Sequence, residues 1–353
     1  MHASPIAYRR QIETTLLAWG ARTETAAATA DVLLYAGLSG IDSHGISMLT
    51  EYDERRRRGW IDLKAKPLVV SETPVSALID GAGGLGHWPG VLGMTEAIQR
   101  AKKSGIAAVA VRNSAHFGAC GYYTKMAAEA GLIGFASTSA SMIRVVPTFG
   151  AEPRLGTDPL SFAAPGADDV PFLLDMATTT VAFGKVRNKL NEKLSCPPGW
   201  VLDASGQPST DPADAAVRGG FLTPLGGTAE NASYKGYGLA AMVNILSSCL
   251  AGAMPITDPA RPASPRGPEI GHFFLALDPG LFREPAAFRA EVAGFCDVLR
   301  ATRPLDPAVP VLVAGDPERA AAERRAREGI PIPPGLAARL KEIAAASDAP
   351  WLL

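Results

Sequence analysis

The chain has 353 residues, enough for a large hydrophobic core divided into two or three subdomains. Its 34 lysines and arginines nearly balance its 35 aspartates and glutamates, which argues against a nucleic-acid-binding protein and predicts small molecules or copies of itself as partners. No signal peptide or membrane span is expected, because the N-terminus lacks an apolar core and no stretch reaches about 20 apolar residues.

The four cysteines lie far apart along the chain, at Cys120, Cys196, Cys249 and Cys296. Their spacing fits neither a zinc site nor a disulfide framework. We therefore expect a cytoplasmic protein without a metal.

Apolar residues at helical spacing predict two helices between residues 8 and 38, separated at 20–23, with Thr23 capping the second. A further helix is expected over 48–58, with its four arginines on a solvated face. The remaining pattern alternates strands and helices. Strands are expected over 67–80, 107–112, 132–138, 172–176 and 271–277, helices over 91–103, 122–130 and, buried, 238–254, and loop-rich segments over 139–166 and 197–227.

The segment Gly81–Gly86 matches the dinucleotide-binding pattern GxGxxG between a predicted strand and a predicted helix. Two features argue against a Rossmann domain. The next strand ends in Asn113 rather than an acidic residue, and the bulky segment 87–89 interrupts the expected helix start. We interpret the segment as a glycine-rich turn that packs tightly under a helix.

Two of the five histidines lie in glycine-flanked polar segments, His44 in Asp-Ser-His-Gly and His116 in Asn-Ser-Ala-His-Phe-Gly. Imidazole exchanges protons near neutral pH, and Gly45 would allow a ligand to approach closely. Two such groups facing one cleft would suit proton transfer at a carbonyl oxygen. The alternative is that each ring is a structural group satisfied by the backbone.

Two further segments suit ligand binding. Asp175, at the tip of an apolar strand, could orient a histidine or bind a ligand amide, or could simply cap a helix. Lys235 precedes a glycine-rich helix start, where the ammonium and the free N–H groups would attract a phosphate. An ordinary helix start with a surface lysine is the alternative.

Taken in order, these segments make the chain resemble the type-2 malate/L-lactate dehydrogenase family, whose members include sulfolactate, ureidoglycolate and diketogulonate dehydrogenases and cyclic imino-acid reductases. The resemblance covers nearly the whole chain and rests on DSHG at 42–45, DGxxGxG at 80–86, NSxHFG at 113–118, GTDP at 156–159, DMAT at 175–178, GWxxDxxGxPxTDP at 199–212, PLGG at 224–227, KGYGL at 235–239 and GHFF at 271–274.

The resemblance implies an α+β, mixed fold that is not Rossmann. It also implies a helical lobe built from residues 1–72 and about 285–353, and a central cofactor- and substrate-binding lobe over 73–284, with 120–170 a possible subdomain. The implied activity is hydride transfer between NAD or NADP and a small 2-oxo or 2-hydroxy acid, by a homodimer. The alternatives are a cyclic imino-acid reductase and a catalytically impaired, ligand-binding member.

The resemblance also implies roles for particular residues. His44 resembles the proton donor or acceptor, held by Ser43 and Asp175, while the role of His116 stays open. The expected cofactor contacts are Ser139, Ser141, Asp175, Met176, Ala177, Lys235 and Gly236.

Position 48 departs from the family pattern. Many members have an arginine there that holds the substrate carboxylate, but this chain has Met48. Arg144 or one of the arginines at 55–58 is the expected replacement, so that Met48, Tyr52 and Arg144 are the candidate substrate residues. Two smaller departures are Tyr234 in place of a histidine and Asp158 in place of an asparagine.

A hydrolase that uses Ser43, His44 and Asp175 is a weaker alternative. Adjacent serine and histidine seldom give the geometry of a nucleophile and its base, and the sequence contains no nucleophile-elbow motif.

Overall fold

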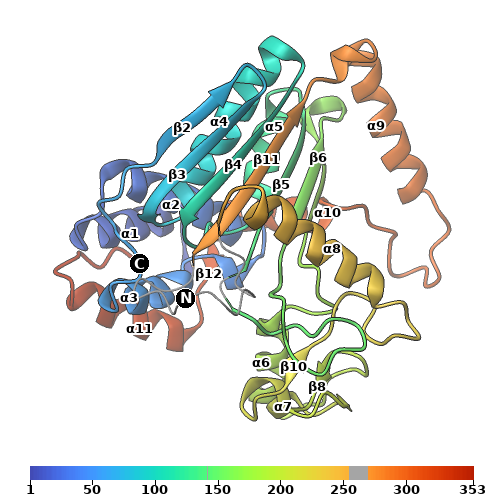
Figure 1. The fold of residues 1–353 in the computed structure, drawn as a ribbon. Coiled ribbons are helices and arrows are strands. Elements are labelled where there is room, and N and C mark those ends of the chain that lie inside the picture. The colour runs from blue at the N-terminus through green and yellow to red at the C-terminus, as the bar shows by residue number, and fades with distance from the viewer. Residues whose placement is uncertain (141, 254–268) are drawn as a thin grey trace.

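The computed structural model describes residues 1–140, 142–253 and 269–353, and its centre is a seven-stranded mixed sheet. The strand order is β2-β3-β4-β11-β5-β6-β7 (Figure 1). Only β3 and β4 are parallel within this sheet, which confirms the expected mixed, non-Rossmann fold. The strands are β2 (Leu68–Thr73), β3 (Ser76–Gly84), β4 (Ile106–Ser114), β5 (Ile133–Thr138), β6 (Leu160–Ala164), β7 (Phe172–Met176) and β11 (Ile270–Leu277).

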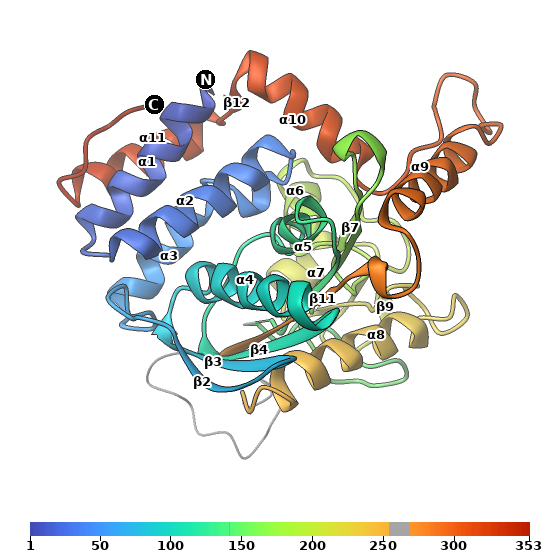
Figure 2. The same cartoon turned by 90° about the horizontal axis from the view of Figure 1, so that it is seen from above.

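Helices cover both faces of this sheet (Figure 2). α4 (His87–Ser104) and α5 (Gly121–Glu129) pack on one face, where Met94 and Tyr123 meet Phe274 in an apolar core. α8 (Tyr234–Asn244) and the π-helical turn Ile245–Cys249 lie on the other face.

A helical layer formed by both ends of the chain lies beside the sheet (Figures 1 and 2). The two ends meet where β1 (His2–Ala3) pairs with β12 (Ile330–Pro331). The layer contains α1 (Pro5–Ala18), α2 (Thr23–Leu38), α3 (Met48–Arg57), α10 (Asp316–Glu328) and α11 (Pro334–Ala345). α9 (Pro285–Arg300) lies apart from it, near β7.

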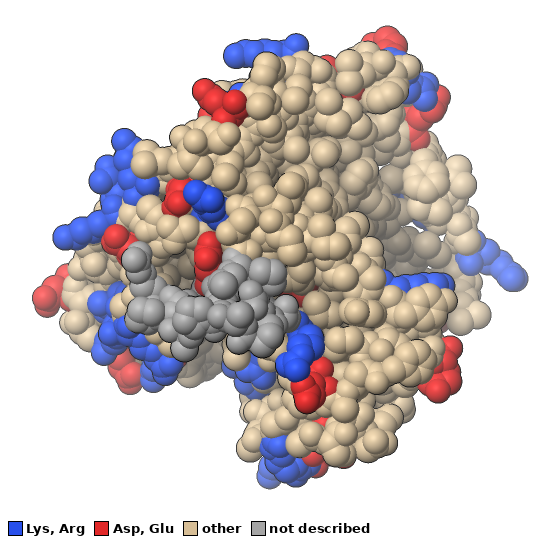
Figure 3. Space-filling view, viewed as in Figure 1, with Lys and Arg blue, Asp and Glu red and all other residues tan. Residues whose placement is uncertain are grey.

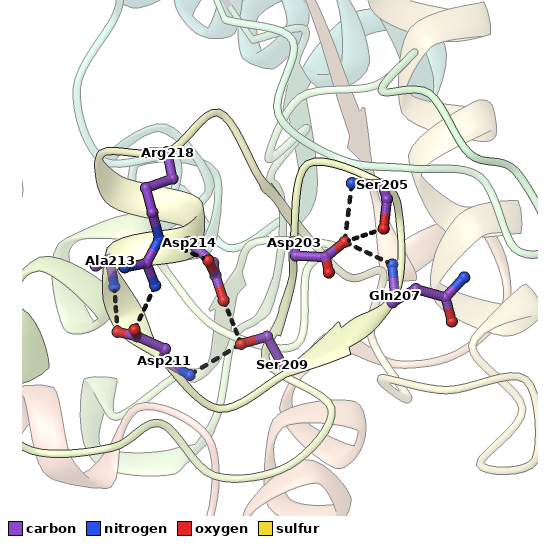
Figure 4. Close-up of polar contacts among 8 residues, drawn as sticks. All are labelled: Asp203, Ser205, Gln207, Ser209, Asp211, Ala213, Asp214 and Arg218. Atoms are coloured by element: carbon purple, nitrogen blue, oxygen red, sulfur yellow. Dashed lines mark hydrogen bonds and ion pairs between the residues drawn. The ribbon is translucent and has the colours of Figure 1, made fainter.

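A small three-stranded sheet contains the segment at 199–212. Its strands are β8 (Val201–Leu202), β9 (Pro208–Ser209) and β10 (Phe221–Leu222), flanked by α6 (Phe183–Asn191) and α7 (Pro212–Ala216). Asp203 accepts hydrogen bonds from the backbone of Ser205 and Gln207, and Asp211 caps α7 (Figure 4). These aspartates therefore stabilise turns next to the small sheet. The 120–170 segment contributes β5 and β6 to the large sheet, and α5 packs against these two strands.

Several predicted boundaries are wrong. The single strand expected over 67–80 is a hairpin of β2 and β3, and β6 lies in the stretch expected to be loop. Arg22, not Thr23, precedes the second helix, and α4 begins at His87 rather than at 91. The helix expected to be buried over 238–254 exposes one face of its described part, where Met242 and Ile245 lie; residues 254–268 fall outside the described part.

The described helices include none that is long and apolar enough to span a bilayer. On the face shown in Figure 3, basic and acidic side chains are intermixed and lie mainly around the rim.

Candidate active site

The glycine-rich segment Gly81–Gly86, which ends β3 and leads into α4, supports the loop that carries His116. Gly86 donates its N–H to the carbonyl of His116 at 3.0 Å, and a Cβ on Gly86 would lie 2.2 Å from the carbonyl oxygen of Ala115. This close contact between backbones leaves no room for a side chain. The turn therefore packs against the 113–118 loop, in agreement with the structural interpretation of GxGxxG.

His44 lies in a single 3₁₀ turn, Asp42–His44, that packs against α2. A Cβ on Gly45 would lie 2.4 Å from the hydroxyl of Tyr8, and this hydroxyl accepts the N–H of Ile46 at 2.6 Å. Gly45 thus makes room for Tyr8, not for a ligand as the sequence suggested. Its role is to hold the turn against the helical layer.

The C-terminal part of the chain holds the same turn from the other side. Arg325 on α10 forms an ion pair with Asp42 through both carboxylate oxygens and donates to the carbonyl of Gly37 at 2.7 Å. A bidentate guanidinium–carboxylate pair restricts the orientation of both groups. The position of His44 therefore depends on residues nearly 300 positions away in the sequence.

The His44 ring is held by its neighbour. The hydroxyl of Ser43 lies 2.9 Å from His44 Nδ1, as the sequence led us to expect. Although the ring is partly exposed, surrounding protein atoms displace enough water to lower the pKa of His44, and the carboxylate of Glu51 partly opposes this shift. His44 is therefore predominantly neutral near pH 7.

The loop after β4 presents His116 through an aromatic stack. Phe117 is buried and stacks on His272 from β11, with ring centroids 4.5 Å apart and planes 6° apart. His272 is in turn fixed by Ser114 at 2.9 Å and Thr138 at 2.7 Å. The GHFF and NSxHFG segments thus form one structural unit that orients His116.

The structure brings His44 and His116 together, as the sequence predicted. Their ring centroids are 5.5 Å apart with planes 30° apart, and both side chains are partly exposed. Burial lowers the pKa of His116 well below its ordinary value, and His44, Arg55, His87 and His272 lower it further. Two neighbouring imidazoles can therefore contact one ligand, and both are neutral near pH 7.

Asp175 lies elsewhere than the sequence suggested. Its carboxylate accepts the N–H of Gly121, the first residue of α5, at 2.7 Å, and burial raises the pKa of Asp175 to about 6. In the described part of the chain it makes no hydrogen bond to Ser43 or His44. The expected relay therefore reaches only from Ser43 to His44, and Asp175 ties β7 to the helix that follows the His116 loop.

The candidate cofactor residues lie on, or shortly after, three separate elements, β5, β7 and α8. Met176 and Ala177 follow Asp175 at the end of β7, and buried Ser139 follows β5 and accepts the N–H of Gly271 at 3.1 Å. Ser141 lies outside the described residues. Lys235 is exposed in the first turn of α8, beside the tightly packed Gly236.

The candidate substrate residues have different surroundings. Met48 is buried in the core of the helical layer. Tyr52 is fully buried, and its hydroxyl lies against His116 and His87 rather than in the open part of the site. The guanidinium of Arg144 stacks 3.9 Å from the ring centre of Phe183 and forms no ion pair with any described residue.

The arginines at the end of α3 are not equivalent. Arg56, Arg57 and Arg58 pair with acidic residues of their own helix. Arg55 is buried, pairs with Glu51, and acts electrostatically on His116. Among the arginines at 55–58, Arg55 is therefore the one whose charge acts on His116.

Sequence reasoning missed four residues that build the site. They are Tyr8, His87, His272 and Arg325, and each acts through a partner far away in the sequence. The scarcity of histidine was the available signal, since four of the five histidines gather here. No group of three His, Cys, Asp or Glu side chains suited to a metal occurs among residues 1–140, 142–253 and 269–353.

The mixed sheet, with a histidine pair beside it, differs from the doubly wound parallel sheet of Rossmann dehydrogenases. Residues 4–341 match the profile of the malate/L-lactate dehydrogenase family. A malate dehydrogenase of Pyrococcus horikoshii is 37% identical over 92% of this chain and 89% of its own.

Solved structures agree with this match. A malate dehydrogenase from Entamoeba histolytica superimposes with a TM-score of 0.94 at 33% identity, covering 99% of both chains. A Δ1-piperideine-2-carboxylate reductase from Pseudomonas syringae gives a TM-score of 0.84 at 27% identity, covering 98% of this chain and 100% of the other. The chain belongs to the malate/L-lactate dehydrogenase family and is an oxidoreductase of the 2-hydroxy-acid dehydrogenase class.

Proposed function

We propose that this enzyme interconverts small 2-hydroxy acids and their 2-oxo counterparts with NAD or NADP, and that His44 exchanges the proton. The observation that carries this proposal is the pair of neutral, partly exposed imidazoles 5.5 Å apart. A neutral imidazole can accept the hydroxyl proton of a 2-hydroxy acid, and the imidazolium can return it to the oxygen in the reverse direction.

Ser43 suits His44 to this role. If its hydroxyl accepts the Nδ1–H of His44, Nε2 is free to take the proton from the substrate. The same hydrogen bond persists in the imidazolium, so that the ring keeps its orientation throughout. Because the pKa of His44 is lowered, the base is available at neutral pH, whereas the acid form needed for reduction becomes more abundant at lower pH.

The N-terminus of α8 is suited to the diphosphate of a nicotinamide cofactor. Its first turn contains no acidic residue, Ser233 does not cap it with its side chain, and the ammonium of Lys235 makes no ion pair with a described residue. An anion there would be stabilised by the lysine and the helix N-terminus. We assign Lys235 and Gly236 to the diphosphate. The rest of the cofactor is assigned to Ser139, Asp175, Met176 and Ala177. When bound, the cofactor would accept or donate the hydride.

We propose Arg144 as the partner of the substrate carboxylate. Within residues 1–140, 142–253 and 269–353, its buried Nε atom has no hydrogen-bond partner and its guanidinium forms no ion pair. Arg55 is the alternative, because it already acts on His116. A cyclic imine acid is the second candidate substrate, favoured by the fold shared with the Δ1-piperideine-2-carboxylate reductase.

We also propose a cytoplasmic homodimer. The four cysteines are free thiols, three of them buried, as is usual in a reducing compartment. Large apolar side chains are exposed along α9 at Phe295 and Val298, and an exposed apolar surface of this kind suits a second copy.

The cofactor assignment is tested by titrating NADH and NADPH and recording nicotinamide fluorescence. Turnover is then measured as the loss of near-ultraviolet nicotinamide absorbance with pyruvate, oxaloacetate, glyoxylate and cyclic imine acids. The proposal requires binding of one cofactor and turnover of at least one acid. Absence of binding at millimolar cofactor would contradict it, and binding without turnover would favour an impaired, ligand-binding member.

The role of His44 is tested by His44→Ala. We expect turnover to fall by roughly 10²- to 10⁴-fold, the usual contribution of general acid–base catalysis, with cofactor affinity nearly unchanged. Lys235→Ala is the matched variant and should weaken cofactor binding instead. If His44→Ala kept more than about a tenth of the wild-type rate, the proton would be exchanged by His116 or water.

A further inference from the structure

A buried chain of hydrogen bonds runs behind His116. Its Nδ1 lies 2.7 Å from the hydroxyl of Tyr52, which lies 3.3 Å from Nε2 of His87. Nδ1 of His87 is 3.2 Å from the hydroxyl of Thr29. Tyr52, His87 and Thr29 are all fully buried, and the proposed reaction gives none of them a role.

One fixed donor determines the direction of every bond in this chain. The backbone N–H of Gly118 points at Nδ1 of His116, with N and Nδ1 3.3 Å apart, and an N–H can only donate. Nδ1 is therefore an acceptor, and the hydroxyl of Tyr52 must donate its single proton to it.

The directions of the remaining hydrogen bonds follow, because the hydroxyl of Tyr52 has a single proton and donates it to His116. Its oxygen can now only accept, so His87 donates Nε2–H to it. His87 then carries no proton on Nδ1, which accepts the hydroxyl of Thr29. The direction of proton donation is thus Thr29 to His87 to Tyr52 to His116.

We infer that Tyr52 and His87 are positioning residues that hold His116 as the neutral tautomer with its proton on Nε2. His116 then donates a hydrogen bond to the carbonyl or carboxylate oxygen of the substrate and does not exchange protons with it. This inference rests on the proposed function in placing the substrate at the histidine pair, and it assigns proton exchange to His44 alone.

The charges around His116 also favour its neutral form. Burial and the basic groups His44, Arg55, His87 and His272 disfavour an imidazolium at this position. Burial also lowers the pKa of His87 to about 3, so that the chain behind Tyr52 stays neutral. When His44 takes a proton, its charge lies 5.5 Å from the His116 ring centre and disfavours a second imidazolium further.

The tautomer is measured by two-bond ¹H–¹⁵N spectra of protein labelled with ¹⁵N-histidine, assigned with His116→Gln and His87→Gln. We expect His116 to show a protonated Nε2 and an unprotonated Nδ1 between about pH 5.5 and pH 8, the range in which an ordinary histidine titrates. A protonated Nδ1, or an imidazolium near pH 7, would overturn the inference. The spectra are recorded without substrate, so the tautomer of His116 can be established even if the proposed function is wrong.

Variants of the chain test the same assignment in the reaction. Tyr52→Phe removes the donor to His116 and should lower kcat by roughly 10- to 100-fold, as loss of an orienting hydrogen bond commonly does, while leaving cofactor affinity unchanged. The ¹⁵N spectrum of Tyr52→Phe should show a mixture of both tautomers. An unchanged kcat together with an unchanged spectrum would contradict the positioning role.

His87 provides the matched pair. His87→Gln keeps a side-chain N–H for the tyrosine oxygen and should retain the His116 tautomer and most of the activity, whereas His87→Leu should lose both. If His87→Leu does not fold, Tyr52→Phe still decides the question. Equal behaviour of folded His87→Gln and His87→Leu would show that the N–H of His87 has no effect on the site.

Discussion

His44 and His116 face each other, but different groups hold their Nδ1 atoms. His44 meets one exposed serine hydroxyl, whereas His116 meets a backbone N–H and a buried tyrosine. The first arrangement leaves a ring free to change its protonation state, and the second fixes it. Two residues of the same type thereby acquire different chemistry from their surroundings.

The pH dependence of oxidation should report this difference. Glu51 raises the pKa of His44, so Glu51→Gln should lower it and move the acid limb of kcat/KM for hydroxy-acid oxidation to lower pH. Glu54→Gln, which removes the partner of the exposed Arg58 on the same helix, is the control and should leave the limb in place. A limb that moves to higher pH in Glu51→Gln would exclude His44 as the base.

At this scale the sequence predicted the two reactive histidines but not the residues that hold them. Histidine is scarce and both segments are flanked by glycine, which made His44 and His116 visible. Tyr8 gives no such signal, and its partner Ile46 lies 38 residues away in the sequence. His87 shares the scarcity of histidine, but its partner Tyr52 lies 35 residues away, so the contact between them has no local signature. Gly45 was noticed for the wrong reason, since its missing Cβ accommodates Tyr8.

At the scale of elements, most helices and the strands β4, β5, β7 and β11 were predicted closely, whereas the β2–β3 hairpin and β6 were not. The turn between β2 and β3 is Pro74-Val75, which lacks the glycine or asparagine that usually marks a hairpin. β6 has five residues within a loop-rich stretch and becomes a strand because β5 and β7 pair with it. Pairing between strands is a tertiary effect that local patterns do not contain.

The contact between α10 and the Asp42–His44 turn leads to a prediction about this pair of elements. Arg325→Met should lower the free energy of unfolding by roughly 1–3 kcal/mol, because it leaves the carbonyl of Gly37 unpaired, while Asp42 remains solvated. It should also lower kcat, since His44 loses its fixed position. Thermal unfolding and steady-state kinetics measure the two effects.

Arg327→Met is the matched control for Arg325→Met. Arg327 lies on the same helix, is exposed and pairs with no described residue. Its replacement should change neither quantity. An Arg325→Met enzyme with normal stability and normal kcat would show that α10 does not position the turn.

At the scale of the whole molecule, the two chain ends close the helical layer that supports one histidine, while the sheet supports the other. The resemblance to the family implied an association of both ends, but the β1–β12 pairing and the Arg325 contact have no signature in the sequence. The division into lobes at residues 72 and 285 stays a prediction.

Two carboxyl groups with raised pKa values, Asp158 and Asp175, affect the stability of the whole molecule. Burial raises the pKa of both Asp158 and Asp175 to about 6. A carboxyl group whose pKa is higher in the folded protein than in the unfolded chain stabilises the fold fully at pH values below its pKa in the unfolded chain. This stabilisation is lost as the pH rises through its pKa in the folded protein. As the pH rises from about 4 to 6, the free energy of unfolding therefore decreases, by roughly 3 kcal/mol at most for each carboxyl group.

Asp158→Asn should remove its share of this pH dependence, measured by denaturant unfolding at a series of pH values. Asp203→Asn is the comparison, because hydrogen bonds from Ser205 and Gln207 lower the pKa of Asp203 and its loss should change the slope in the opposite sense. A slope that is the same in wild type and Asp158→Asn would contradict the burial of a raised-pKa carboxyl at this position.

The central claim is that His44 exchanges the substrate proton beside a neutral His116. The most direct test is a crystal structure with reduced cofactor and oxamate, an unreactive analogue of a 2-oxo acid. The account predicts the oxamate carbonyl oxygen within hydrogen-bond distance of Nε2 of both histidines, and the cofactor diphosphate beside Lys235. Oxamate bound away from His44, or a diphosphate remote from α8, would contradict it.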